Sequence, residues 1–218
     1  MFLPLRDENT SGKFPGVNIL LILANLAVFV YQLTLTPRLE KAFVLANAMI
    51  PARIPSALAG HGSLEGALLP LATSMFLHAG FAHILGNMLF LWIFGDNVEA
   101  RFGHLGYLLF YFVCGIGAGL AHVVFNLNSH LPAVGASGAI SGVMGAYIVL
   151  EPHNRILTLI FIFVVRVPAG IVLGLWFLMQ FLSGISTLGL TVNGGVAVWA
   201  HIGGFLIGVV IALSAKRR

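Results

Sequence analysis

Apolar residues in this chain gather into six long segments, separated by stretches that hold most of the charges and prolines. A helix rises 1.5 Å per residue, so about 20 apolar residues are needed to cross the hydrocarbon core of a bilayer. The fourth segment looks too short for a full crossing. The pattern predicts an all-α polytopic membrane protein built as a bundle of six transmembrane helices. The six segments cover residues 17–35, 81–94, 104–125, 138–150, 169–185 and 196–213.

The connections between these segments differ in kind. Residues 1–16 are polar and contain glycine and proline, which predicts a short cytoplasmic tail, and residues 216–218 form a second tail after a six-helix domain of residues 17–215. The long first loop, residues 36–80, has too many prolines for a span and is too apolar for a disordered linker. We expect it to be partly helical and to rest on the membrane. Residues 156–165 are apolar and precede an arginine and a proline, which predicts an interfacial or re-entrant connection.

The composition agrees with a membrane protein that has little soluble mass. Of the 218 residues, 59% are hydrophobic and only 8% are charged, whereas soluble domains carry about 25% charged residues. Several cations flank apolar segments, as membrane anchors do, so the net charge of +4 does not indicate nucleic-acid binding. The single cysteine, Cys114, excludes an internal disulfide framework.

The positions of the cations predict how the bundle is oriented. Lysine and arginine gather in cytoplasmic connections. The connections after the third and fifth spans contain neither residue, which places both termini in the cytoplasm. The first loop carries three cations of its own and departs from this pattern. The cations on the expected cytoplasmic side are Arg6, Lys13, Arg101, Arg155, Arg166, Lys216, Arg217 and Arg218.

Three polar residues on different spans, Ser137, His201 and His83, are expected at one depth in the membrane. Each lies roughly four helical turns before the charged residue that closes the cytoplasmic end of its span. At 1.5 Å per residue these offsets correspond to about 20–22 Å, roughly 10 Å below the outer surface of a ~30 Å core. Polar groups in a membrane are costly and usually face a partner or a water-filled cavity. Helix packing alone does not readily explain why three polar residues on different spans lie at the same depth in the membrane.

A serine and a histidine at one level can form a nucleophile and its general base. In this hypothesis Ser137 attacks a carbonyl carbon while His201 removes the hydroxyl proton. The oxyanion that develops needs donors, and Ser137 lies at a helix start, where backbone N–H groups lack intrahelical partners. The side chains of His83 and Asn87, one turn apart on one helix face, could supply the other donors. This chemistry requires no cofactor.

A serine in a glycine-rich helix more often serves packing than chemistry. Gly138-xxx-Gly142 in the fourth segment and Gly204-xxx-Gly208 in the sixth are faces of small residues that let helices approach closely. They predict that these two helices touch. Such a contact would bring the serine and the histidine together, so the packing interpretation supports the catalytic one.

A metal site is the other interpretation of the polar residues in the second segment. His78, His83 and Asn87 lie close in sequence, and histidine is a common metal ligand. However, the two histidines are five residues apart, which suits one helix face poorly, and no carboxylate or cysteine joins them. The pattern therefore favours no metal.

Four motifs, in this order and on these segments, resemble the rhomboid family of intramembrane serine proteases over residues 78–208. The resemblance implies a six-helix rhomboid fold and a Ser–His dyad without an acid, in which Ser137 is the nucleophile and His201 is the base. It implies an oxyanion site made by the Ser137 amide, His83 and Asn87. The motifs are His78-x4-His83-x3-Asn87, Gly95-x3-Glu99-x-Arg101, Gly135-Ala136-Ser137-Gly138 and Ala200-His201-Ile202-Gly203-Gly204.

The resemblance also assigns supporting roles and reveals one departure. His78 would support the first loop or its water network and take no part in the chemistry, and Glu99 and Arg101 would form a structural clamp on the cytoplasmic side. In well-studied members a tyrosine four residues after the nucleophile stacks on the catalytic histidine. Here that position is Ser141, which cannot stack. Another ring, or close packing at the next glycine, must therefore orient His201.

The function that the resemblance implies is cleavage of single-span membrane proteins in or near their transmembrane segments. By resemblance the fifth segment, with Trp176 and Phe177, would be a lateral gate for substrates that arrive through the lipid, although each of these two aromatic residues fits a simple lipid-facing position equally well. The alternative is a catalytically silent rhomboid-like protein that binds membrane clients, and the presence of both dyad residues argues against it. A small transporter would need more carboxylates within the spans. The lack of organelle-targeting features indicates a prokaryotic plasma membrane, and the oligomeric state is left open.

Overall fold

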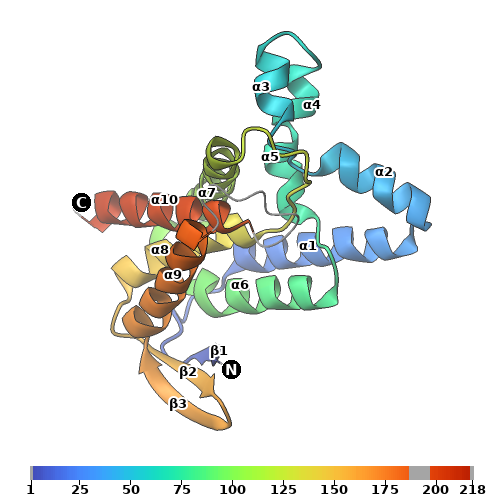
Figure 1. Cartoon of the computed structure of the whole chain (residues 1–218). Coiled ribbons are helices and arrows are strands. Elements are labelled where there is room, and N and C mark those ends of the chain that lie inside the picture. The colour runs from blue at the N-terminus through green and yellow to red at the C-terminus, as the bar shows by residue number, and fades with distance from the viewer. Residues whose placement is uncertain (1, 187–196, 217–218) are drawn as a thin grey trace.

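A computed structural model describes residues 2–186 and 197–216, which are mostly helical (Figure 1). Within these residues, six longer helices are joined by short helices, loops and a small antiparallel sheet. The elements are β1 (Phe2–Asp7), α1 (Gly16–Thr34), α2 (Pro37–Asn47), α3 (Arg53–Leu58), α4 (Leu64–Leu68), α5 (Pro70–Thr73), the 3₁₀ helix η1 (Ser74–Phe76), α6 (Phe81–Phe102), α7 (His104–Phe125), α8 (Ser137–Leu150), β2 (Arg155–Ile160), β3 (Phe163–Pro168), α9 (Ala169–Ser186) and α10 (Val198–Lys216).

Helices α1, α7, α9 and α10 are each long and apolar enough to cross a membrane. Helix α6 meets the same standard together with Leu64–Phe76, from which it is bent by 79°. The described residues thus contain four or five candidate spans of a multi-pass membrane protein, and α8 is a shorter apolar helix of 14 residues. Helix α7 begins and ends where the sequence predicted, whereas α6 continues to Phe102, two turns past its predicted end at Phe94.

Helix α8 lies inside the bundle and contacts α6, α7, α9 and α10. Every residue from Gly138 to Tyr147 is buried. The backbones of α8 and α10 lie in direct contact. A Cβ added to Gly204 would lie only 2.0 Å from the carbonyl oxygen of Gly138. A Cβ added to Gly208 would lie equally close, at 2.0 Å, to the carbonyl oxygen of Gly142. The predicted contact between the two faces of small residues is confirmed.

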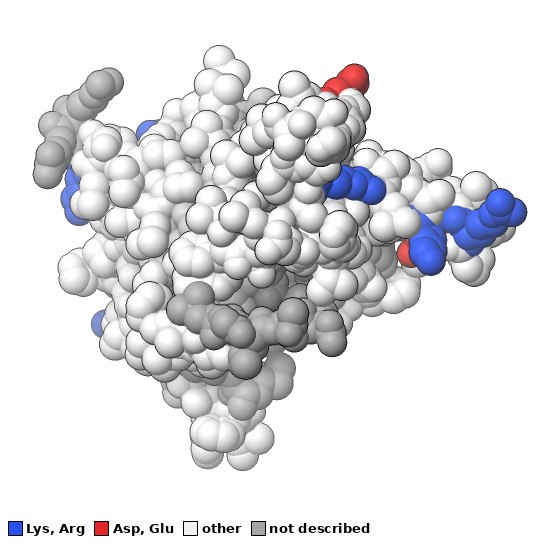
Figure 2. Space-filling view, turned by 45° about the horizontal axis from the view of Figure 1, so that its top comes forward, with Lys and Arg blue, Asp and Glu red and all other residues white. Residues whose placement is uncertain are grey.

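The outer faces of the long helices are apolar, as expected for helices that contact lipid. Leu23 of α1, Leu109 of α7 and Val210 of α10 are each more than half exposed. Figure 2 shows a face that is almost entirely uncharged, with lysine and arginine side chains at its margins. Soluble monomers rarely expose so many large apolar side chains on their long helices.

The first loop is partly helical, as the sequence predicted, and it is tied to the segment that precedes α8. It contains α2 to α5 and η1. Met49 and Ala133 form an isolated antiparallel bridge, and the backbone N–H of Gly135 donates to the carbonyl of Ser74 at 2.9 Å. These bonds fix the entrance to α8. Contact of this loop with a membrane surface stays a prediction.

A three-stranded sheet occupies two segments for which the sequence predicted no strands. Strand β1 pairs antiparallel with β2, which pairs antiparallel with β3. The segment predicted as a simple polar tail therefore contains the strand β1. The expected interfacial segment 156–165 is most of a hairpin that leads directly into α9. Each strand is short, and the partner of β1 lies beyond the eight helices α1 to α8 that follow it in the chain. Local sequence patterns carry little information about such a pairing.

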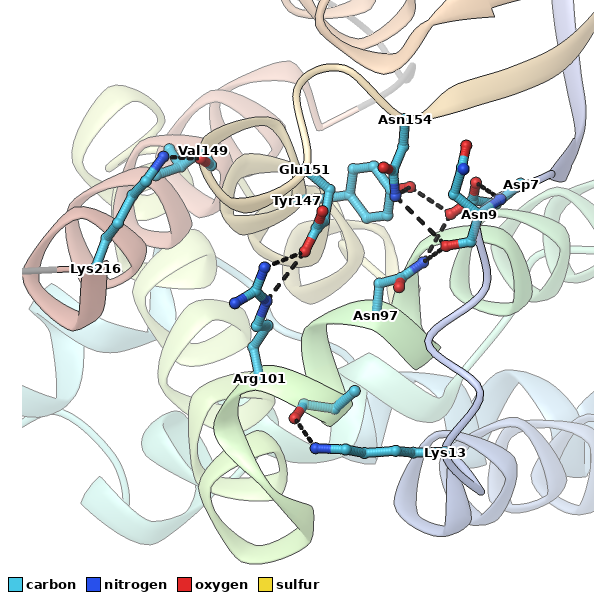
Figure 3. Close-up of polar contacts among 11 residues, drawn as sticks. Asp7, Asn9, Lys13, Asn97, Arg101, Tyr147, Val149, Glu151, Asn154 and Lys216 are labelled. Atoms are coloured by element: carbon cyan, nitrogen blue, oxygen red, sulfur yellow. Dashed lines mark hydrogen bonds and ion pairs between the residues drawn. The ribbon is translucent and has the colours of Figure 1, made fainter. Parts of the chain in front are cut away.

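A buried polar cluster joins this sheet to the bundle (Figure 3). Asp7 is 3% exposed and accepts hydrogen bonds from Nδ2 of Asn97, at 2.7 Å, and from the hydroxyl of Tyr147. Nδ2 of Asn154 donates to the same tyrosine oxygen at 3.1 Å. Strand β1 is thereby attached to both α6 and α8.

Glu99 and Arg101 make structural contacts, in agreement with the clamp that the resemblance implied. The carboxylate of Glu99 accepts hydrogen bonds from the backbone N–H groups of Val17, at 2.9 Å, and Asn18, at 2.7 Å. These groups begin α1 and have no partner within that helix. Arg101 donates two hydrogen bonds to Glu151, at the end of α8, at 2.7 and 3.0 Å (Figure 3).

Candidate active site

Ser137 begins α8 and lies next to α10. Its hydroxyl oxygen is 2.8 Å from Nε2 of His201. Gly135, two residues earlier, has a φ of +122°, which glycine adopts readily and other residues do not. This turn presents Ser137 at the start of the helix, where backbone N–H groups lack intrahelical acceptors. The structure therefore brings the expected nucleophile and base into contact.

His201 lies in the first turn of α10 and is 8% exposed. Its Nδ1 is 2.9 Å from Oε1 of Gln180 on α9. A neutral imidazole carries hydrogen on one nitrogen and accepts at the other. Because Oε1 of Gln180 can only accept, Nδ1 carries the hydrogen and Nε2 accepts from the Ser137 hydroxyl. The three side chains form a hydrogen-bonded chain across α8, α10 and α9.

The groups that orient His201 come from α9. The Trp176 ring lies 5.9 Å from the His201 ring, centroid to centroid, with a tilt of 39°. Ser141, at the position of the expected tyrosine, donates to the carbonyl of Ser137 at 2.6 Å and stays within its own helix. These contacts agree with the expectation that another ring compensates for Ser141. The acceptor at Nδ1 is an amide, which also fits a dyad without an acid.

His83 of α6 lies on the other side of the entrance to α8. Its Nδ1 accepts a hydrogen bond from the backbone N–H of Ala79 at 3.4 Å, so in the neutral ring Nε2 carries the hydrogen. A Cβ added to Gly135 would lie 2.7 Å from this Nε2 and 3.8 Å from the Ser137 hydroxyl. An N–H donor of His83 is therefore near Ser137.

Asn87 follows His83 by one turn of α6 and is 7% exposed. Its Nδ2 donates to the backbone carbonyl of His83 at 2.9 Å. A side-chain amide has two hydrogens on nitrogen, so the second is left for another acceptor. The structure brings His83 close to Ser137 and sets Asn87 next to His83.

His78 lies behind His83 at 2% exposure, with 5.1 Å between the ring centroids. Its backbone exchanges two hydrogen bonds with the side-chain amide of Gln32 on α1, at 3.0 and 3.2 Å. These bonds attach the backbone before α6 to α1, and a role of the His78 side chain in supporting the first loop stays a prediction. Among the residues that the structure describes, no three His, Cys, Asp or Glu side chains are grouped so as to hold a metal ion.

A cavity of about 40 Å³ adjoins Ser137. Ser74, Gly115, Gly135 and Ala200 contribute to its lining. A cavity of this size holds at least one water molecule when polar partners are present, and the two serines provide them. A larger hollow of about 490 Å³ lies among residues of α2, α3 and α4, in the first loop.

The family model of the Rhomboid domain matches residues 65–218, well over half of the chain. The chain belongs to the rhomboid family. The matched range contains Ser137, His201, His83 and Asn87, and so all four residues that the sequence selected.

This rhomboid chain is similar in sequence to several curated rhomboid proteins. Rhomboid protease GluP of Bacillus subtilis is 38% identical over 104 residues, which are 45% of this chain and 20% of that protein. The mitochondrial Rhomboid protein 1 of Saccharomyces cerevisiae is 33% identical over 143 residues, or 62% of this chain and 38% of that protein. The mitochondrial RHOMBOID-like protein 12 of Arabidopsis thaliana is 29% identical over 207 residues, or 87% and 55%. The chain thus spans between a fifth and about half of these relatives.

Gln180 was not among the site residues predicted from the sequence of this rhomboid chain. It lies within the apolar stretch that forms α9. A polar side chain within an apolar span indicates a partner inside the protein. The same criterion selected residues on the other helices, and its application to the fifth apolar segment would have found this amide.

Proposed function

We propose that this rhomboid chain is an intramembrane serine endopeptidase that hydrolyses peptide bonds in or near the transmembrane segments of other membrane proteins. The observation that carries the proposal is the 2.8 Å contact between the Ser137 hydroxyl and Nε2 of His201. The other ring nitrogen, Nδ1, is hydrogen-bonded to the side-chain oxygen Oε1 of Gln180. A serine paired with a neutral imidazole in this tautomer has the arrangement of an activated nucleophile.

The reaction follows from the positions of these groups. Ser137 Oγ attacks the scissile carbonyl carbon while its proton moves to Nε2 of His201, and the carbonyl oxygen becomes an oxyanion. The Ser137 N–H, Nε2–H of His83 and the second amide hydrogen of Asn87 are the donors for this oxyanion. His201 then gives its proton to the leaving amine. Water then attacks the acyl carbon while its proton moves to Nε2 of His201. The bond between the acyl carbon and Ser137 Oγ breaks, His201 returns the proton to Oγ, and the second product leaves as a carboxylic acid.

The proposed topology has six spans, α1, α6, α7, α8, α9 and α10, with both termini in the cytoplasm. The distribution of cations along the chain supports this orientation. Helix α8 does not need full membrane length, because the other helices surround it and water is tolerated where protein lines the site. We propose a prokaryotic plasma membrane as the location. The named relatives include a bacterial protein and mitochondrial ones, and fractionation of the membranes of the source cells tests the assignment.

Helix α9 is the proposed entrance for transmembrane substrates. In its described part only four residues are buried, Ala169, Val172, Leu173 and Gly184, whereas α8 is buried without interruption from Gly138 to Tyr147. A sparsely packed helix is displaced at lower cost than a central one. A substrate in the lipid would pass α9 to reach Ser137, and its helix must unwind there because a helical peptide bond is shielded.

A fluorophosphonate probe, which reacts with activated serines, tests this function. The full chain, solubilised in detergent, should be labelled, and labelling should be lost in both Ser137→Ala and His201→Ala. Matched controls are Ser214→Ala, an exposed serine on the same helix as His201, and His61→Ala in the first loop; both should label like the wild type. The same variants are compared for cleavage of a transmembrane peptide in vesicles.

The alternative function, a catalytically silent protein that binds membrane clients, predicts a different outcome. The wild type would then capture transmembrane peptides but would show neither labelling nor cleavage. That result, obtained with folded protein, would refute the protease proposal. The 2.8 Å contact and the orientation of the base favour the protease.

A further inference from the structure

We propose that Gln180 is a positioning residue that holds the His201 ring in the tautomer able to accept the proton of Ser137. The proposal rests on the proposed function. It adds a third residue, on a third helix, to the pair that the family motifs contain. Gln180 lies in no motif that the sequence analysis singled out.

Both ring nitrogens of His201 have partners. Oε1 of Gln180 lies 2.9 Å from Nδ1, and the hydroxyl of Ser137 lies 2.8 Å from Nε2. An imidazole can carry its hydrogen on either nitrogen, and the hydrogen bond made by one nitrogen determines the state of the other. With an acceptor at Nδ1, the hydrogen stays there and Nε2 keeps its lone pair. Without that acceptor, the tautomer with hydrogen on Nε2 also forms, and it cannot take the serine proton.

Gln180 would do in an apolar helix what a buried aspartate does in Ser-His-Asp hydrolases, where the carboxylate fixes the tautomer and orientation of the histidine. A carboxylate within a span would be costly without a charged partner. An amide offers the acceptor oxygen without the charge. Because it stabilises the imidazolium less than a carboxylate does, we expect its loss to lower the rate by about 10- to 100-fold, less than the roughly 10⁴-fold loss in a triad.

Aromatic contacts hold the amide of Gln180 within reach of His201. Trp176 lies one turn before Gln180 on α9, so the two side chains share a face. The Trp176 ring is 6.1 Å from the Phe205 ring of α10, and the Phe177 ring stacks on Phe205 at 4.6 Å. Displacement of α9 from α10 would remove the amide and the indole from His201 together. The base is therefore fully oriented only while α9 is packed against α10.

The test uses the full chain in vesicles of phosphatidylethanolamine and phosphatidylglycerol, with a fluorogenic transmembrane peptide as the substrate. Gln180→Leu and Gln180→Met remove the acceptor at similar volume, and Gln180→Glu keeps an acceptor oxygen. Met179→Leu, at an exposed neighbouring position on α9, is the matched control. Two apolar replacements are used because one of them can fail to fold, which the unfolding temperature reports.

We expect kcat to fall about 10- to 100-fold in Gln180→Leu and Gln180→Met while KM changes by less than about twofold, because the lost interaction acts on the chemical step. Gln180→Glu should recover turnover and move the acidic limb of the pH–rate profile to higher pH, because a carboxylate stabilises the imidazolium. Met179→Leu should match the wild type. An unchanged kcat in the apolar variants, or a rise in KM alone, would overturn the proposal.

Nitrogen-15 NMR of histidine-labelled protein reports the tautomer without any need for turnover. The His201 signals, identified by their loss in His201→Ala, should show the hydrogen on Nδ1 in the wild type and a mixture in Gln180→Leu. Hydrogen on Nε2 in the wild type would overturn the proposal, as would an unchanged Nδ1–H in the variant. If the wild-type protein is neither labelled by the fluorophosphonate nor able to cleave the peptide, the protease function is refuted. The NMR result is independent of that outcome and still decides whether Gln180 sets the tautomer of His201.

Discussion

Gly204 keeps α8 and α10 in backbone contact at the level of Ser137 and His201, and we expect Gly204→Ala to separate them. The added Cβ would lie 2.0 Å from the carbonyl oxygen of Gly138, whereas ordinary contact begins at 3.4 Å. To restore van der Waals contact, the two backbones must therefore move apart by about 1.4 Å, the difference between 3.4 and 2.0 Å. Added to the 2.8 Å between Ser137 and His201, this shift gives about 4.2 Å, which is too long for a hydrogen bond.

The expected result is a loss of general-base assistance, which contributes about 10²–10⁴-fold to a rate. Labelling by a fluorophosphonate should therefore slow by about 100-fold or more. Overpacking of this kind also costs about 1–3 kcal/mol of stability, which thermal unfolding in the same detergent measures. Gly174→Ala on α9 is the control, because no atom lies within 4 Å of its added Cβ.

Equal labelling rates and equal unfolding temperatures for Gly204→Ala and Gly174→Ala would refute this reasoning. The backbone contact of α8 with α10 would then not set the distance between nucleophile and base. A lower unfolding temperature with a normal labelling rate would show that the helices part elsewhere than at the dyad, which also contradicts the prediction.

Three further predictions concern other parts of the structure. Asn87→Ala should lower turnover about 10²–10³-fold, the usual effect of removing an oxyanion donor, with unchanged thermal unfolding; wild-type turnover would reject the role. Gly135→Ala should impair labelling, because its Cβ would lie 2.7 Å from Nε2 of His83 at a φ of +122°, and normal labelling would show that the turn adapts. Asp7→Ala should lower stability by about 1–3 kcal/mol for each buried donor left unpaired, Tyr147 among them, while peptide cleavage persists; an unchanged unfolding temperature would contradict this.

The residues of the dyad could be found from the sequence because each is an isolated polar group in an apolar segment. Membrane length fixes depth along a helix, so residue counts from the charged ends bring Ser137 and His201 to one level. Glycine spacing on the two helices then predicts their contact, which the backbone approach at Gly204 and Gly208 confirms. The connection 187–196 lies outside the described residues, so its expected loop stays a prediction.

Other features depend on contacts between distant segments. The sequence of strand β1 has no alternation of apolar and polar residues that distinguishes it from an irregular tail. The strand forms because β2 offers a free edge for pairing and because Asp7 accepts hydrogen bonds from Tyr147 and Asn97. Helix α6 runs past Gly95 because α1 packs on it there, with Asn18 against the glycine. Local patterns do not record these pairings.

The sequence by itself determined the class of protein and the long helical segments, and it selected Ser137, His201, His83 and Asn87 as the candidate site, because hydrophobic length and isolated polar groups are local properties. Only the tertiary structure decided which group orients His201. The residue at the expected position, Ser141, bonds to its own helix, and the acceptor is Gln180 from α9. The reason is physical: a hydrogen bond between helices depends on how two helices are rotated and how far apart they lie, and packing of the whole bundle sets both quantities.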